Sequence, residues 1–175
     1  DPGAGTGART LLEGRNAALP PDYGWEYALW VEGWNQKVLT PSDPGDPASA
    51  PVEMSGSPLR VRVDLDGGTV IIRMPKEILP TNTDPESIGY TAAVLGQEGF
   101  PSTGVRRVRD VGRTAGQWVF GGAPDNVNHT RIIDMVMPET ASPDQAELLS
   151  EYEAAQGQVS DLSPDQFPRA YVHTR

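Results

Sequence analysis

The four tryptophans are the side chains of this 175-residue chain best suited to ligand binding. Trp30 and Trp34 lie in the stretch GWEYALWVEGWNQKVLT, close to Glu26, Glu32 and Asn35. Indole rings stack on the apolar faces of sugar rings, while carboxylates and amides bind the hydroxyl groups. The stretch therefore predicts a carbohydrate-binding surface of Trp30, Glu32 and Trp34. The alternative is that another segment covers these rings and makes them packing residues.

Trp118 is a further candidate for carbohydrate contact. It lies in the apolar stretch GQWVF and shares a strand face with Phe120. That pairing is typical of a core position, so a role in packing competes with a role in binding.

Residues suited to catalysis or cofactor binding are scarce. The chain has two histidines and no cysteine, which excludes disulfides and cysteine nucleophiles, and no serine lies in a strand-to-helix elbow. We expect no catalytic residue and no cofactor. Oxygen-rich loops at DPGDP, DLDGG and PDNVN could hold a structural calcium ion, but none reproduces a defined calcium loop, so solvated turns are the preferred interpretation. Heme binding would need axial ligands such as Met54, Met74 or His129 in one pocket.

The charge of the chain excludes one class of partner. Twenty-four acidic and 14 basic residues give a formal net charge of −10, which repels phosphate backbones and argues against nucleic acid. No apolar run approaches the roughly 20 residues of a membrane span. The 19 glycines and 17 prolines are spread between apolar runs, a pattern typical of short strands joined by turns.

Alternating side chains predict the strands that must position the tryptophans. In the strand over residues 25–32, the face that we expect to form the core consists of Trp25, Tyr27, Leu29 and Val31. Trp30 lies on the other face and would point away from that core. Trp34 would do the same if the strand continues past Gly33.

The stretch LRVRVDLDGGTVIIRM, residues 59–74, predicts a β-hairpin. Apolar and charged residues alternate before the glycines, and a two-residue turn at Gly67-Gly68 or Asp66-Gly67 returns the chain. A short helical turn is expected at PKEILP. Further strands are expected at GYTAAVLGQ, RRVRDV, GQWVF and RIIDMVM.

One helix is predicted near the C-terminal end. Ser142-Pro143-Asp144-Gln145 combines a capping hydroxyl, a proline at the first helical position and a glutamine three residues after the cap. The apolar stripe of this helix extends to Tyr152. An edge strand is expected at RAYVHT in the tail.

These elements predict a single mostly-β module, an antiparallel sandwich with one short helix. Within residues 1–175 we expect a loop-rich segment over residues 1–24, the core strands and helix over residues 25–155, and a tail over residues 156–175.

Several separated motifs in one order resemble the C-terminal module of glucodextranases and related amylopullulanases, also described as DOMON-like and surface-layer-associated. The resemblance covers roughly residues 5–155 and is carried by GWEYALWVEGW, VLGQEGFPSTGVRRVRDV, GQWVFGG, RIIDMVMP and DQAELLSEYEAA. It implies an immunoglobulin-like, DOMON-type β-sandwich that is exported and not catalytic. The implied partner is a polysaccharide or the cell envelope, at an extracellular or cell-surface location. The resemblance assigns no ligand-binding residue.

The family module usually begins upstream of the point where this chain starts. A partial sandwich exposes strand edges and an apolar face, which another polypeptide would need to cover. We therefore expect the remaining strands to come from an upstream fragment of the same protein or from neighbouring subunits. This expectation raises an alternative to carbohydrate binding, a structural subunit of a surface layer or filament. The resemblance to DOMON domains adds a third possibility, a heme-binding electron-transfer domain.

Overall fold

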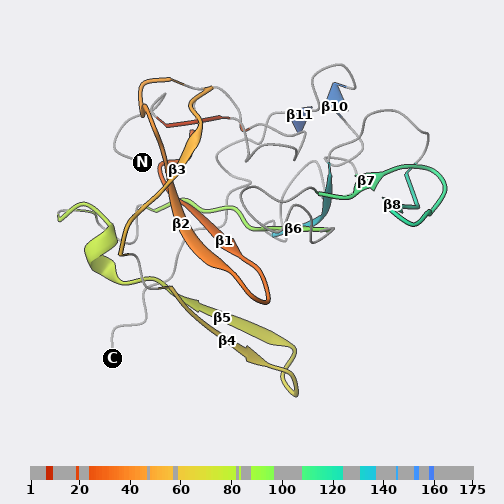
Figure 1. The fold of residues 1–175 in the computed structure, drawn as a ribbon, viewed down its shortest axis with the longest axis horizontal. Coiled ribbons are helices and arrows are strands. Elements are labelled where there is room, and N and C mark those ends of the chain that lie inside the picture. The colour runs from red at the N-terminus through yellow and green to blue at the C-terminus, as the bar shows by residue number, and fades with distance from the viewer. Residues whose placement is uncertain are drawn as a thin grey trace.

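The chain is mostly β, with several antiparallel sheets, as the sequence predicts. The computed structural model describes residues 7–9, 19, 24–46, 48–56, 59–81, 83, 88–96, 108–123, 131–136, 145, 152–153 and 158–159. Figure 1 shows the arrangement of the elements in these residues. They are β1 (Ala28–Val31), β2 (Gln36–Pro41), β3 (Pro51–Glu53), β4 (Arg60–Asp64), β5 (Thr69–Arg73), the 3-10 helix η1 (Lys76–Ile78), β6 (Ala93–Leu95), β7 (Asp110–Val111), β8 (Val119–Phe120), β9 (Ile132–Met135), β10 (Tyr152–Glu153) and β11 (Gln158–Val159).

The largest described sheet joins β1, β2 and β3 in antiparallel order. Its buried side chains include Trp30 on β1 and Val38 and Leu39 on β2, whereas Leu29 is 40% exposed. The prediction that the Leu29 face of this strand forms the core is therefore wrong. Both faces of the strand carry large apolar side chains, so alternation alone could not show which face the rest of the chain covers.

The N-terminal segment contributes to the core beside this sheet. Ala8 forms an isolated antiparallel bridge with Trp25 just before β1, and its side chain is fully buried. Leu19 is also buried, and its N–H donates to the carbonyl oxygen of Arg9 at 2.7 Å. The described residues of the segment over residues 1–24 thus include packed positions.

The predicted hairpin over residues 59–74 is confirmed as β4 and β5. The two strands pair from Arg60 with Arg73 to Asp64 with Thr69. The turn spans the four residues 65–68 instead of the predicted two, and Asp64 Oδ1 accepts a hydrogen bond from Gly67 N–H at 3.1 Å. A carboxylate that binds a backbone N–H in this way stabilises a longer turn. The predicted helical turn at PKEILP is confirmed as η1.

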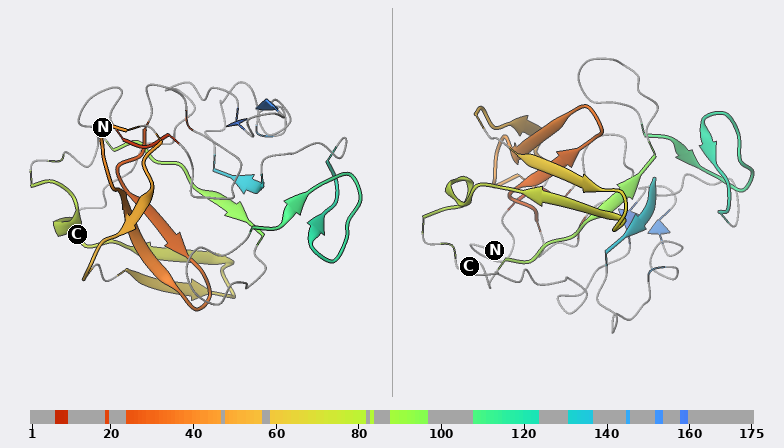
Figure 2. Two further views of the ribbon diagram at one scale, coloured as in Figure 1. Left: turned by 45° about the horizontal axis from the view of Figure 1, so that its top comes forward. Right: turned by 90° about the horizontal axis from the view of Figure 1, so that it is seen from below.

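The four strands predicted between residues 89 and 137 are confirmed as β6, β7, β8 and β9. β6 pairs with β9 in antiparallel register, with an irregularity between Val94 and Leu95. β7 and β8 pair in parallel, an exception to the expected antiparallel arrangement. In both views of Figure 2 the β7–β8 loop extends from one end of the molecule, away from the β1–β2–β3 sheet. No helix among the described residues is long and apolar enough to cross a membrane.

The predicted C-terminal helix lies mostly outside the described residues. Gln145 is helical, and its Oε1 accepts a hydrogen bond from Met135 N–H at 3.3 Å, which links this residue to β9. The prediction that the helix reaches Tyr152 is wrong, because Tyr152 and Glu153 form β10 and pair with β11. Strand pairing overrides helix propensity at this point. The predicted edge strand at RAYVHT lies outside the described residues.

Candidate functional site

The turn between β1 and β2 presents Trp34 at the surface. Trp34 is 63% exposed, and the turn is closed by a hydrogen bond of 2.8 Å from Glu32 N–H to the carbonyl oxygen of Asn35. Glu32 and Asn35 are half-buried on the same turn. The structure thus brings three of the residues singled out by sequence together on one tight turn.

Trp30 does not share this surface with Trp34. It lies on β1 opposite Lys37 of β2 and is only 9% exposed. Its ring is part of the core and has no free face on which a sugar could stack. Of the two tryptophans in this stretch that were predicted to bind carbohydrate, only Trp34 is placed where a ligand can reach it.

Trp118 is also at the surface, in the loop that connects β7 to β8. The residue precedes β8 directly and is 46% exposed, so the interpretation of Trp118 as a core residue is wrong. The loop is held by backbone hydrogen bonds from Gly112 N–H to the carbonyl oxygen of Phe120 at 2.8 Å and from Gly116 N–H to that of Val119 at 2.9 Å. These bonds fix the backbone on both sides of Trp118, while its ring faces solvent in part.

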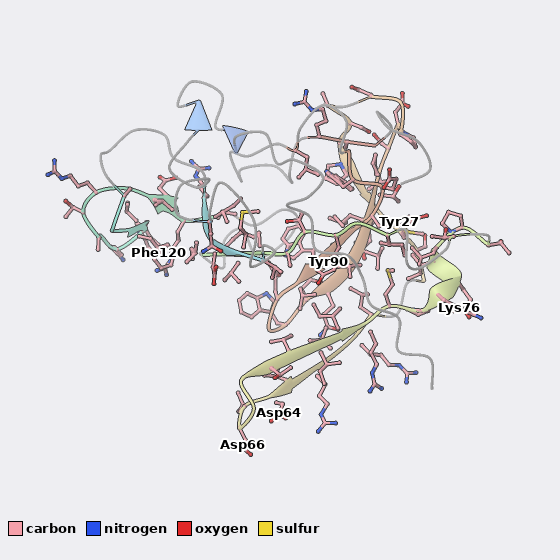
Figure 3. The ribbon with its side chains drawn as sticks, turned by 180° about the vertical axis from the view of Figure 1, so that it is seen from behind. Tyr27, Asp64, Asp66, Lys76, Tyr90 and Phe120 are labelled. Atoms are coloured by element: carbon pink, nitrogen blue, oxygen red, sulfur yellow. The ribbon has the colours of Figure 1, made fainter. Side chains whose placement is uncertain are left out.

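Arg109 lies against two aromatic rings of this loop. Its guanidinium carbon is 5.7 Å from the ring centroid of Trp118 and 5.6 Å from that of Phe120. Both distances are within the range of cation–π attraction. Figure 3 shows Phe120 at one side of the molecule, well separated from the labelled Tyr27 and Tyr90. Arg109, Trp118 and Phe120 form what we call the arginine–aromatic cluster.

The guanidinium of Arg109 is not neutralised by a carboxylate among the described residues. Its Nε is buried and has no hydrogen-bond partner there. The adjacent acid, Asp110, forms an ion pair with Arg131, with 2.6 Å between Oδ1 and Nη2. The cluster therefore presents a cation beside an exposed indole ring, and it can offer N–H donors and an apolar face to the same ligand.

The sequence contains a signal for Arg109 that the sequence analysis did not use. RRVRDVGR, residues 106–113, holds four arginines and one aspartate within a chain whose net charge is −10. A basic stretch of this kind shortly before GQWVF indicates a local positive site next to aromatic residues. The contact between Arg109 and both rings, however, depends on the parallel pairing of β7 with β8, which the sequence does not predict.

Gly96 contacts two residues of the arginine–aromatic cluster, Arg109 and Phe120. It directly follows β6, is buried, and its carbonyl oxygen accepts the Arg109 N–H at 3.1 Å. A Cβ atom at this position would overlap the ring of Phe120. The absence of a side chain at residue 96 is what allows Phe120 to pack there and to reach Arg109.

Replacing Gly96 with alanine should lower the free energy of unfolding by about 1–3 kcal/mol, because the added methyl group displaces Phe120. Urea denaturation followed by tryptophan fluorescence measures this loss. Gly33→Ala is the matched control, since a Cβ there meets no atom within 4 Å, and we expect a change of about 0.5 kcal/mol or less. Equal losses in the two variants would contradict the close packing of Phe120 on Gly96.

A second surface feature is an open depression of about 620 Å³ beside β2 and β3. It is lined by Gln36, Lys37, Val38, Glu53, Met54, Ser55 and Gly56. Lys37 and Glu53 form an ion pair across it, with 2.8 Å between Nζ and Oε2. Because this cation and this carboxylate are paired with each other, the depression has less charge available for a ligand than the arginine–aromatic cluster.

The residues named for metal and heme binding are not brought together in the described part of the chain. That part contains no group of three or more histidine, aspartate or glutamate side chains placed to hold a metal ion. Asp43 and Asp46 in DPGDP and Asp64 in DLDGG each accept a hydrogen bond from a backbone N–H close by in the sequence. Met54 lines the depression and Met74 follows β5. PDNVN and His129 lie outside the described residues, so calcium and heme binding stay predictions.

A comparison with protein families identifies the chain. Residues 1–164 match the model of the C-terminal binding module, SLH-like, of glucodextranase. The chain belongs to this family. No curated protein and no solved structure matches it. The predicted resemblance to the glucodextranase C-terminal module is thus confirmed. Within this binding module, Trp34 and Trp118 are exposed, and Arg109 and Phe120 are half-buried beside Trp118.

Proposed function

We propose that this glucodextranase C-terminal module binds carbohydrate at the cell surface, without catalysis, and that the arginine–aromatic cluster is the binding site. The observation that carries the proposal is Trp118, a large aromatic ring that is 46% exposed and lies next to the guanidinium of Arg109. Family membership supports a binding role. Family membership does not identify the binding residues; these are inferred from the exposure of Trp118 and its contact with Arg109.

The chemistry of the cluster suits a sugar ring. The exposed face of Trp118 offers an apolar surface for the C–H face of a pyranose, and Arg109 supplies N–H donors for ring hydroxyls or a carboxylate. Arg109 is held by its backbone bond to Gly96 and by both rings. A site held in this way loses little conformational freedom on binding, which favours affinity.

Trp34 is the second candidate surface. It is more exposed than Trp118, and Glu32 and Asn35 lie on the same turn. The β1–β2 hairpin lies near the middle of the molecule in Figure 1, whereas β8 lies at its right-hand side. Trp34 and Trp118 thus belong to separate elements, and each can be tested alone.

Replacing Trp118 with alanine is expected to weaken binding to a soluble glycan about 10-fold, through loss of the stacking surface. Affinity gel electrophoresis with dextran, and with polysaccharide stripped from cell envelopes, measures the change. Trp34→Ala is the matched control, an exposed tryptophan removed from another element. If Trp34→Ala abolishes retention and Trp118→Ala does not, the site lies on the β1–β2 turn. If neither glycan retains the unmodified module, the proposed function is wrong.

A further inference from the structure

The β4–β5 hairpin is the most exposed strand pair whose side chains the structure describes. Nine of its ten strand residues are exposed, with Val61 half-buried. In Figure 1 the hairpin lies along the lower edge of the molecule, with β4 as the outer strand in that view. Among the described residues β4 pairs with β5 and with no other strand. Its outer edge therefore carries backbone groups that can pair with another strand.

The charged residues on β4 are ordered so that two antiparallel copies of the strand place opposite charges next to each other. The sequence LRVRVDLD, residues 59–66, has arginines before Val63 and aspartates after it at alternating positions. Antiparallel pairing of two copies about Val63 places Arg62 of each copy opposite Asp64 of the other. The same register brings Arg60 opposite Asp66, which lies in the turn that follows β4. Figure 3 shows Asp64 and Asp66 at the outer end of the hairpin.

Other registers of the same strand keep only part of this complementarity. Pairing centred on Arg62 places two arginines opposite each other, and pairing centred on Asp64 does the same with two aspartates. Like charges directly opposite each other destabilise a sheet. A shift by one residue turns the charged side chains of one copy to the opposite face from those of the other. The other edge, β5, has Arg73 as its one charged residue and specifies no register.

We propose that two copies of this module associate by antiparallel pairing of β4 with β4 about Val63, to give a four-stranded sheet. Two-stranded hairpins are marginal on their own, and additional strands stabilise a sheet. The register also sets Val61 of each copy opposite Leu65 of the other, and Leu65 is 87% exposed in the single chain. This interface is independent of the proposed glycan binding, since it uses neither Trp34 nor the arginine–aromatic cluster.

Charge reversal tests the register directly. In Arg62→Asp, each copy places an aspartate opposite Asp64 of the other, and we expect the dissociation constant of the dimer to rise about 10-fold or more. The double variant Arg62→Asp/Asp64→Arg restores opposite charges and should return the dissociation constant to within about 3-fold of the unmodified value. Sedimentation equilibrium over a concentration series measures both. The measurement is made at about 0.15 M salt, where the Debye length is about 8 Å. Salt at this concentration screens the repulsion between the net charges of the two copies more than the attraction between charged side chains in contact.

Two further variants control the experiment. Asp64→Arg alone loses the hydrogen bond to Gly67 N–H as the double variant does, so the comparison of the two cancels any effect on the turn. Arg73→Asp makes the same change in charge on β5 and should leave the dimer intact. Circular dichroism checks that each variant retains its β structure.

The outcomes separate the alternatives. A weakened dimer in both single reversals on β4, recovered in the double reversal, supports the pairing. A module that stays monomeric at all concentrations overturns the proposal. A dimer whose dissociation constant is unchanged by Arg62→Asp also overturns it. A dimer lost in Arg73→Asp but not in Arg62→Asp places the contact on β5 and also overturns it. Binding of glycan by the same samples reports on the proposed function separately.

Discussion

Replacing Trp30 with alanine is expected to lower the free energy of unfolding by about 3–5 kcal/mol, among the largest single losses in this module. Trp30 is 9% exposed and lies on β1, an edge strand that pairs with the central strand β2 of the β1–β2–β3 sheet. Removing its ring leaves a cavity next to residues that the sheet holds in place, so little of the lost contact can be recovered. Urea denaturation measures the loss. Because domains are stable by only about 5–15 kcal/mol, the variant should unfold at a much lower denaturant concentration.

Trp34→Ala is the matched control, with the same chemical change four positions away. Trp34 is 63% exposed, and we expect its removal to change the free energy of unfolding by about 0.5 kcal/mol or less. Equal destabilisation by the two variants would contradict the placement of Trp30 in the core and Trp34 at the surface.

Replacing Arg109 with glutamine is expected to weaken glycan binding about 10-fold or more, since a hydrogen bond from a charged donor contributes about 1.5–3 kcal/mol. Glutamine retains a donor but removes the charge and the attraction to the rings of Trp118 and Phe120. Arg109→Lys retains the charge without the planar fork and should show an intermediate loss. Affinity electrophoresis with the glycan that retains the unmodified module measures both.

Arg73→Gln is the control for this series, because it makes the same change on the exposed strand β5, away from the arginine–aromatic cluster. We expect its glycan affinity to be unchanged. The tryptophan emission spectrum of the module provides a second measurement, since loss of the cation beside Trp118 should alter it in Arg109→Gln and not in Arg73→Gln. Full affinity in Arg109→Gln would show that the guanidinium does not contact the ligand.

The prediction that other strands complete the sandwich stays open. The described sheets have two or three strands each, and none of them is closed. Pairing through β4 would supply strands from a second copy, whereas an upstream fragment would supply different ones. Intact mass and sedimentation on material from the natural source distinguish these two origins. The division of residues 1–175 into one module likewise stays a prediction.

Local patterns in the sequence determined which segments form strands. Alternating residues on either side of Gly67-Gly68 predicted β4 and β5, because glycine tolerates the backbone angles of turns; Gly68 has a φ of 59°. Short apolar runs bounded by turn residues predicted the positions of β6, β7, β8 and β9. The family was recognisable for the same reason, since its motifs are local.

Only the tertiary structure decided which of these residues face a ligand. Alternation shows that β1 has two different faces, but both carry large apolar side chains, so the segments packed against the sheet determined that Trp30 is buried and Leu29 exposed. The parallel pairing of β7 with β8 likewise brought Arg109 to Trp118 and Phe120. Burial and long-range pairing depend on contacts between distant parts of the chain, and period-two patterns contain no information about those contacts.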